Sequence, residues 1–446
     1  MRVSLSWLKQ LVQVTDSVDA LAHRLSMAGF EEEEIEDLSA RAKGVVVGFV
    51  KEREKHPNAD KLSVCQVDIG SEESIQIVCG AKNVRAGLHV PVAMVGAELP
   101  AVNLTIKAGE LRGVSSNGMI CSLSELGLAT ESDGIAELDA LTDELPALGA
   151  PVAPMLGLDD TVLELAITAN RPDGLSMVGI AREVAALTGA ALTLPDLTLK
   201  PAHELLQASD ASAEAMQAGG LYGITLIEGV DGSRVSPTWV QQRLERAGIN
   251  RVNAVVDITN VVMLEQGQPL HAFDADALEQ LTGKPVNAAS FGLRQAREGE
   301  AFIGLDDREL SLDSRAQVVT CHDLPIALAG VMGSKASGVT AATGRIWLES
   351  AMFSPAAVRT TARSVGLRTD ASARFEKGLP REMTLACSIR ALELLKELFP
   401  CEAKGLWVCG DSAAAASSVL LRRDALHQLL GPLEDEEGSS DLADAV

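Results

Sequence analysis

A long, mostly apolar stretch occupies residues 253–274, NAVVDITNVVMLEQGQPLHAFD. Its first part, residues 254–259, is rich in β-branched side chains, which favours a buried strand. A helix-compatible segment follows and leads into a turn at 266–269 that contains Gly and Pro. His271 comes directly after this turn. We expect the strand and the loop to form one wall of a pocket, although this stretch alone is better explained by a structural histidine that caps a carbonyl.

Short β-type segments broken by turns follow one another from residue 44 to residue 128. Several short strands with glycines at the corners predict a small β-barrel of the OB type. We place this barrel at residues 39–150.

The segments that flank the barrel are each too small to fold alone. Residues 1–38 predict a strand, a helix over 17–28 and an acidic, extended exit. Residues 159–189 predict a strand, a turn and a helix that begins near Ser176 and ends at Gly189. We therefore expect residues 1–38 and 151–190 to form one small α/β domain, into which the barrel is inserted.

Residues 220–400 alternate β segments with helices, a pattern typical of an α+β domain. The clearest predicted helices in it lie at 237–247 and 383–398. Residues 191–219 predict a linker. Residues 401–446 predict the truncated start of a further helical domain with an acidic, disordered tail. The predicted fold class is thus α+β and multi-domain.

Composition restricts the possible functions. The chain has 446 residues, is 47% apolar and carries a formal net charge of −24. This charge disfavours non-specific binding to phosphates, so any nucleic-acid binding requires a local basic face. The seven cysteines include no CxxC pair, which suits a reducing cytoplasm and predicts no metal site. No signal peptide and no membrane span are expected.

The barrel segment contains three recognisable motifs: residues 56–62 (HPNADKL), residues 79–83 (CGAKN) and residues 116–119 (SNGM). With these motifs it resembles the tRNA-binding OB domain shared by several aminoacyl-tRNA synthetase polypeptides. The resemblance implies that exposed cations contact the RNA backbone, although ordinary solvated residues are an equally good explanation for any one of them. The candidate cations are Lys61, Lys82, Arg85, Lys107 and Arg112.

The order of motifs along the whole chain resembles the β subunit of bacterial phenylalanyl-tRNA synthetase. The motifs include ITANRPDGLS, INRVNAVVDITN, GQPLHAFD, ALAGVMG, LESAMF and LRTDASARFEKG. The resemblance implies a heterotetramer of two α and two β chains that charges tRNA(Phe). It implies that the whole enzyme uses ATP and Mg²⁺, with the aminoacylation site on the α subunit and no site for either evident in this chain, and that the β subunit hydrolyses mischarged Tyr-tRNA(Phe).

The resemblance also implies an editing pocket, residue by residue. Thr259 and His271 match its first wall and, with Glu349, are the catalytic candidates. Glu349 matches the carboxylate that recognises the tyrosine hydroxyl. The remaining substrate-binding candidates are Ala329 and Gly330, which would admit the ring, and Thr369 and Ala371, which match the last wall.

Glu349 is chemically suited to that role. Phe and Tyr differ by one hydroxyl, and a site with a buried acceptor can discriminate by about 10⁴ because Phe would leave the acceptor unpaired. Ester hydrolysis requires little more than a positioned water and stabilisation of the developing charge. The sequence shows no nucleophile–base pair, so His271 is not assigned as an obligatory general base.

The chain departs from the family pattern at Ser334-Lys335, Val261, Ala373 and Leu221, and in an insertion near 284–292. The resemblance implies that the family continues through catalytic-like and anticodon-binding domains, so we expect this sequence to be either a fragment or truncated product, or a shortened relative that works differently. Two alternatives therefore stay open: a non-enzymatic tRNA-binding or assembly module, and a free-standing deacylase that edits in trans.

Overall fold

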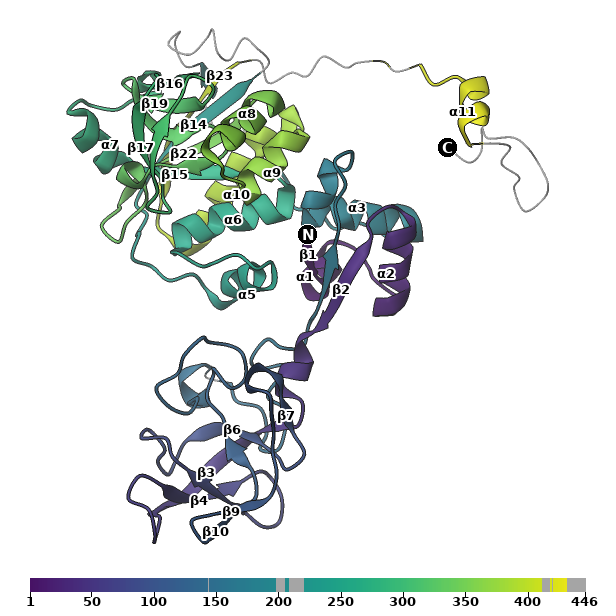
Figure 1. Cartoon of the computed structure of the whole chain (residues 1–446), viewed down its shortest axis with the longest axis vertical. Helices are drawn as coiled ribbons and strands as arrows, with labels where there is room; N and C mark the ends of the chain where they lie inside the picture. The colour runs from purple at the N-terminus through teal and green to yellow at the C-terminus, as the bar shows by residue number, and fades with distance from the viewer. Residues whose placement is uncertain (143, 198–204, 208–219, 411–417, 419, 431–446) are drawn as a thin grey trace. The chain divides into compact units, whose positions relative to one another are not determined.

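The computed structural model describes residues 1–142, 144–197, 205–207, 220–410, 418 and 420–430. Its architecture is mixed α+β (Figure 1). Met1–Gly410 form one unit, and Asp411–Val446 form a second, of which helix α11 (Arg423–Leu430) is described. The predicted acidic tail, residues 431–446, lies outside the described residues.

The N-terminal part is built on a three-stranded antiparallel sheet, in which β12 (Thr161–Leu165) lies between β1 (Arg2–Ser4) and β2 (Glu32–Asp37). Residues 1–38 and 159–189 therefore share one sheet, as the sequence predicts. Ser17 and Ser176 accept backbone N–H bonds at the starts of α2 and α3, and Gly189 ends α3 in the left-handed conformation. The helices of this part are α1 (Leu5–Leu11), α2 (Val18–Met27) and α3 (Met177–Thr188).

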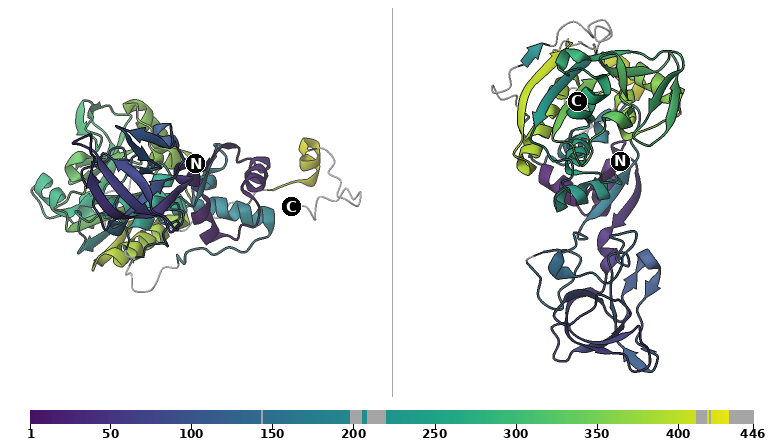
Figure 2. Two further views of the ribbon diagram at one scale, coloured as in Figure 1. Left: turned by 90° about the horizontal axis from the view of Figure 1, so that it is seen from below. Right: turned by 90° about the vertical axis from the view of Figure 1, so that its left-hand side faces the viewer.

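Between β2 and β12, the chain forms a five-stranded antiparallel sheet in the order β11-β6-β3-β4-β5. The two edge strands approach each other, where Val78 N donates to Ser116 Oγ (3.0 Å) and Asn117 N donates to Gln76 O (2.9 Å). The sheet is thus a nearly closed barrel, which the right-hand view of Figure 2 shows end-on. Its strands are β3 (Val45–Lys55), β4 (Ser63–Asp68), β5 (Ile75–Cys79), β6 (His89–Ala93) and β11 (Met119–Ile120).

The third part has a five-stranded sheet in the order β13-β23-β14-β22-β15. One face packs on α6 and α10, and the other packs on a second sheet in the order β16-β19-β20-β21. The four longer strands of the five-stranded sheet are β14 (Leu221–Glu228), β22 (Arg345–Met352), β15 (Leu270–Asp274), which lies at one edge, and β23 (Glu402–Cys409). The second sheet has β16 (Phe291–Gln295), β19 (Gln317–Cys321), β20 (Leu324–Leu328) and β21 (Met332–Gly333). The main helices are α5 (Thr238–Arg246), α6 (Ala254–Gln266), α7 (Ala275–Thr282), α8 (Pro355–Val365), α9 (Asp370–Lys377) and α10 (Arg381–Leu398).

The predicted strand at 254–259 is wrong, because these residues begin helix α6. Asn253 caps the helix through Oδ1, which accepts from Val256 N (3.0 Å), and Gly267 ends it at φ +84°. The helix is buried on nearly all sides, so its apolar run carries no helical periodicity that would distinguish it from a buried strand. The predicted helices at 237–247 and 383–398 are confirmed by α5 and α10.

The main sheet continues beyond residue 400, where the sequence predicted the end of this part. Strand β23 pairs with β14 over seven positions from Tyr222 to Glu228. A short strand in the predicted linker, β13 (Leu205–Gln207), pairs in parallel with β23. Backbone pairing across the sheet therefore places the boundary after Gly410.

No helix in the described ranges combines the length and the apolar character needed to cross a membrane. Within the same ranges, no group of three or more His, Cys, Asp or Glu side chains is arranged to hold a metal ion.

Candidate functional site

A small cavity of about 70 Å³ lies in the third part, where strands β15 and β22 meet the β20–β21 turn and helix α9. Most of its wall is apolar, and its two titratable side chains are His271 and Glu349. Its lining consists of Pro269, Leu270, His271, Ala327, Leu328, Gly330, Val331, Met332, Gly333, Glu349, Ala371 and Phe375.

The strand register brings His271 and Glu349 together. They are direct partners in the antiparallel pair β15–β22, so their side chains leave the same face of the sheet. Glu349 is only 7% exposed. Its Oε2 accepts a hydrogen bond from the hydroxyl of Tyr222 at 2.7 Å. Among the described residues, no other donor reaches this carboxylate.

Burial dominates the electrostatics of Glu349. It raises the pKa of this carboxyl to about 7, and the hydrogen bond from Tyr222 partly opposes the rise. Burial and the nearby charge of Glu349 raise the pKa of Tyr222, so its phenol stays protonated and keeps donating. A carboxylate held near its titration point in a small apolar cavity is a feature of functional sites.

His271 is a neutral, incompletely bonded imidazole. Burial lowers its pKa to about 4, so the ring carries no charge near pH 7. Its Nε2 is buried and has no hydrogen-bond partner within the described part of the chain. The ring fits there because position 333 is glycine: a Cβ at Gly333 would lie 2.5 Å from Nε2. A buried, unpaired nitrogen is costly unless a water or a ligand bonds it.

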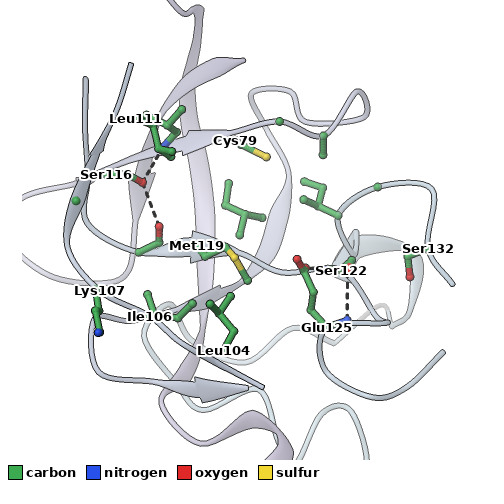
Figure 3. Close-up of a pocket in the computed structure, with 18 of the residues that line it drawn as sticks. Cys79, Leu104, Ile106, Lys107, Leu111, Ser116, Met119, Ser122, Glu125 and Ser132 are labelled. Atoms are coloured by element: carbon green, nitrogen blue, oxygen red, sulfur yellow. Dashed lines mark hydrogen bonds between the residues drawn. The ribbon is translucent and has the colours of Figure 1, made fainter. Parts of the chain in front are cut away.

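A second, larger cavity of about 700 Å³ lies at the seam of the barrel, where β5 faces β11 (Figure 3). Ser116 crosses this seam through its bonds to Val78 N and Gly118 O. Apolar side chains including Ile106 and Met119 form part of the wall, and Lys107 lies at its side.

The five candidate cations of the barrel are all exposed, but they differ in pairing. Arg85 makes a bidentate ion pair with Glu137, with both N–O distances at 2.8 Å. The other four make no ion pair within the described residues. Arg85 is therefore the weakest phosphate-binding candidate, because its charge is already matched.

The HPNADKL motif has a structural role in this barrel. His56 Nδ1 accepts from Asn58 N (3.0 Å), so its Nε2 carries the proton and donates to Leu111 O (2.9 Å). Asn58 Nδ2 also donates to Arg112 O (2.9 Å). These bonds hold the loop that carries Lys61 against the hairpin that carries Arg112.

Two stretches of the chain match models of known protein families. Residues 45–144 match the family model described as "Putative tRNA binding domain", and residues 218–400 match the "B3/4 domain". The phenylalanine–tRNA ligase β subunit of Parasynechococcus marenigrum (strain WH8102) is 97% identical over all 446 residues, which cover 55% of that protein. By sequence, the chain belongs with the N-terminal part of the phenylalanine–tRNA ligase β subunits.

A second relative shares less of the sequence. The phenylalanine–tRNA ligase β subunit of Synechococcus sp. (strain CC9605) is 70% identical over 444 residues, covering 100% of this chain and 54% of the relative. The chain thus spans about half the length of the curated relatives it matches. Among solved structures, an N-terminal fragment of the phenylalanyl-tRNA synthetase β subunit from Pyrococcus horikoshii shares 15% identity, with a TM-score of 0.27, over 63% of this chain and 75% of that chain.

Of the seven editing residues that the resemblance to these β subunits predicts, four line the small cavity: His271, Gly330, Glu349 and Ala371. Gly330 has a structural requirement of its own. Its φ is +69°, and a Cβ there would approach Val358 and Phe375 to about 3 Å. Any side chain at this position would therefore be strained and would crowd the cavity wall.

The other three predicted residues do not line the cavity. Thr259 lies on α6, which packs on the opposite face of the sheet, and its hydroxyl donates to Val256 O at 2.6 Å. Thr369 caps α9 and donates to Val331 O at 2.9 Å, so it anchors the cavity wall from behind. Ala329 is fully buried beside Gly330.

The departures from the β-subunit pattern also lie outside the cavity lining. Val261 is fully buried in α6, and the exposed Lys335 pairs with Asp307. Ser334 is buried with its hydroxyl near that of Ser337, and Ala373 lies on α9. The insertion near 284–292 contributes no lining residue.

Tyr222 is the residue of this site that the sequence did not assign. It is the only tyrosine in the chain, set in the apolar strand β14, 127 residues away from Glu349. A lone phenol in a buried strand was the available signal, since a buried Tyr hydroxyl usually has a partner. The identity of that partner depends on the strand order.

Proposed function

We propose that this chain is the N-terminal, editing part of a phenylalanine–tRNA ligase β subunit and that it hydrolyses Tyr-tRNA(Phe). The observation that supports this most is the small apolar cavity with a buried carboxylate, Glu349, whose Oε1 accepts no bond from the described residues. A tyrosyl hydroxyl can donate to that oxygen, whereas a phenylalanyl ring would leave it unpaired.

In the proposed reaction, water attacks the carbonyl carbon of the aminoacyl ester, the bond to the ribose oxygen breaks, and one proton of the water passes to that oxygen. With a pKa of about 4, His271 is too weak a base for efficient proton abstraction near pH 7. Its unpaired Nε2 is better suited to hold the attacking water. Positioning of this kind can supply most of what an activated ester needs.

The same proposal includes the partners of the whole ligase. The barrel binds tRNA(Phe), with Lys61, Lys82, Lys107 and Arg112 as the cations free to meet phosphates. Two such chains work with two α subunits in the cytoplasm. ATP and Mg²⁺ are required at the α subunit, and neither is assigned to residues of this chain.

A second candidate function, a tRNA-binding module without editing activity, has its own support. The cavity of about 70 Å³ is smaller than the roughly 150 Å³ cavity that accommodates benzene in another protein. The phenol that occupies Glu349 belongs to the protein itself. On this alternative, the cavity is a packed remnant and the barrel carries the function.

Deacylation of Tyr-tRNA(Phe), measured with and without α subunit and beside Phe-tRNA(Phe), separates these functions. We expect hydrolysis of the tyrosyl ester, with the phenylalanyl ester spared. Salt-dependent tRNA binding without hydrolysis under either condition would favour the binding module. Full activity without the α subunit would indicate an enzyme that edits in trans.

A further inference from the structure

We infer that Tyr222 is a positioning residue for Glu349, holding Oε2 so that Oε1 is presented to the hydroxyl of the tyrosyl substrate. This inference rests on the proposed editing function and specifies how its selectivity arises. One carboxylate would then accept hydrogen bonds from two phenols, one from the protein and one from the substrate.

The strand register creates this arrangement. Tyr222 lies opposite Ala351 in the pair β14–β22, two positions along β22 from Glu349 and on the same face of the sheet. Both side chains are nearly inaccessible, with 6% and 7% exposure. Their 2.7 Å bond is therefore not exchanged for water, and it limits rotation of the carboxylate.

Within the described residues, no side chain other than Tyr222 is hydrogen-bonded to Glu349. His271 faces it from β15, Cys321 on β19 lies near Tyr222, and the β20–β21 turn and α9 present apolar side chains and glycines. No cation reaches the carboxylate within the described residues. Among the described residues, it is the phenol of Tyr222 whose hydrogen bond stabilises the charged form against burial.

An ionised carboxylate accepts hydrogen bonds but cannot donate them. When Tyr222 keeps Glu349 ionised, Oε1 requires a donor, and only the tyrosyl ester brings one. If Glu349 were protonated, its own O–H could turn to another acceptor, and the penalty against a phenylalanyl ring would weaken. Tyr222 therefore affects both the orientation and the charge of the selecting group.

The test is the pH profile of kcat/KM for Tyr-tRNA(Phe) with Tyr222→Phe, which removes one oxygen and keeps the ring. We expect the acid limb to shift upward by about one pH unit, so that activity on that limb falls about tenfold and recovers at higher pH. In a Glu349→Gln background, the same change should cause no further loss. Tyr222→Leu, which also removes the ring, separates packing effects from the effect of the hydroxyl.

Because Tyr222 is the only tyrosine, growth on 3-fluorotyrosine labels this chain at one position. We expect a single fluorine NMR signal that titrates with Glu349 in the wild type and loses this titration in Glu349→Gln. An active wild type whose pH profile is unchanged by Tyr222→Phe would overturn the inference and leave editing intact. A wild type that hydrolyses neither ester, with or without α subunit, would overturn both.

Discussion

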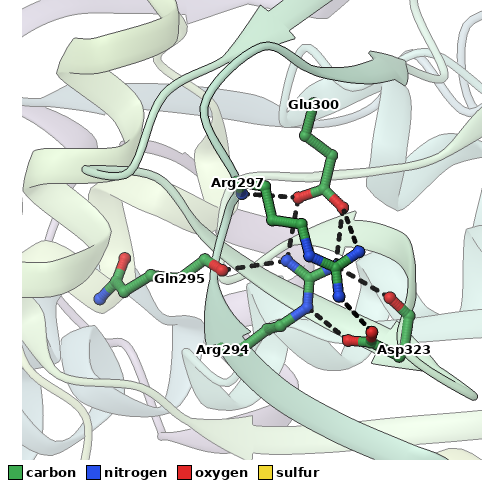
Figure 4. Close-up of polar contacts among 5 residues, drawn as sticks. All are labelled: Arg294, Gln295, Arg297, Glu300 and Asp323. Carbon is green, nitrogen blue, oxygen red and sulfur yellow. Dashed lines mark hydrogen bonds and ion pairs between the residues drawn. The ribbon is translucent and has the colours of Figure 1, made fainter.

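Two carboxylates of the third part, Glu300 and Glu349, are both largely buried but have opposite environments. Glu300 accepts two bonds from the guanidinium of Arg294 (2.7 and 2.9 Å) and one from Arg297 N (2.9 Å) (Figure 4). Arg294 also bonds Asp323 at 2.7 Å. Glu349 accepts one bond from a neutral phenol.

Their pKa values respond in opposite directions. The bonds from Arg294 lower the pKa of Glu300, while burial raises the pKa of Glu349 to about 7. Through Arg294, the matched charge of Glu300 ties the start of β17 (Glu300–Ile303) to the β19–β20 hairpin, and both of its carboxylate oxygens already accept bonds from the protein. The two carboxylates thus differ in their partners more than in their exposure, and Glu349 keeps an oxygen, Oε1, that accepts no bond from the described residues.

The largest expected effect comes from Glu349→Gln. We expect the ratio of kcat/KM for Tyr-tRNA(Phe) to that for Phe-tRNA(Phe) to fall at least about 100-fold. The side-chain amide of Gln can both donate and accept hydrogen bonds, so it does not depend on a donor from the substrate. Glu309→Gln, at an exposed glutamate on β18 (Glu309–Leu312), is the matched control. An unchanged ratio in Glu349→Gln or Glu349→Ala would show that this carboxylate does not select the substrate.

Arg294→Met tests the carboxylate that is paired with a guanidinium, Glu300. Leaving the largely buried Glu300 without its guanidinium should cost about 2–3 kcal/mol of unfolding free energy. Substrate discrimination should not change, because no residue of this cluster lines the cavity. Urea denaturation measures the first effect and deacylation the second. Unchanged stability would mean that water replaces the guanidinium.

The pH dependence of stability should differ in sign. Glu300 has a lowered pKa, so its contribution is present above the unfolded value of about 4.3 and is lost as pH falls through the folded value. Glu349 has a raised pKa, so the native state binds the extra proton between about 4.3 and 7 and loses stability as pH rises there.

Unfolding of each Glu→Gln variant, measured against wild type from pH 2 to pH 8, isolates these slopes, with that of Glu300 below about pH 4.3 and that of Glu349 above it. The expected slope from Glu349 is at most about 1.4 kcal/mol per pH unit. It is partly masked in wild type by His271, whose lowered pKa gives the opposite slope. If both variants changed the pH dependence of stability in the same direction, the proposed difference between Glu300 and Glu349 would be wrong.

Gly333→Ala should act on the imidazole side of the cavity. The new Cβ would lie 2.4 Å from His271 Cε1, so the ring must move. We expect a loss of about tenfold in kcat/KM, from misplacement of a positioning group, with little change in discrimination. Gly344→Ala is the control, because a Cβ there has open space. Equal activity of the two variants would exclude a role for the position of His271.

The smallest expected effect concerns two cations of the barrel, Lys61, which makes no ion pair within the described residues, and Arg85, which is paired with Glu137. Lys61→Ala should weaken tRNA binding by about two- to threefold and reduce its salt dependence, because one phosphate contact is lost. Arg85→Ala should change neither, since Glu137 already pairs with that guanidinium. Filter binding at several salt concentrations measures both. Equal losses would mean that the ion pair opens on RNA.

Much of the local structure followed from the sequence. Helix α3 could be predicted because Ser176 and Gly189 provide the start and stop signals that any helix needs, and α5 and α10 because their patterns are helical. Helix α6 could not, because complete burial removes the amphipathic period. The local clues to it were its cap, Asn253, the helix-compatible segment after residue 259, and Gly267 at its end.

For the cavity, the sequence by itself determined residue types: a glutamate in an apolar strand, a histidine after a turn, and small residues where a wall is close. Only the tertiary structure decided which of them meet. The pairing of β14, β15 and β22 puts Tyr222, His271 and Glu349 on one face, while Thr259 lies on a helix against the other. Strand order and register depend on packing over more than a hundred residues, and no local pattern encodes them.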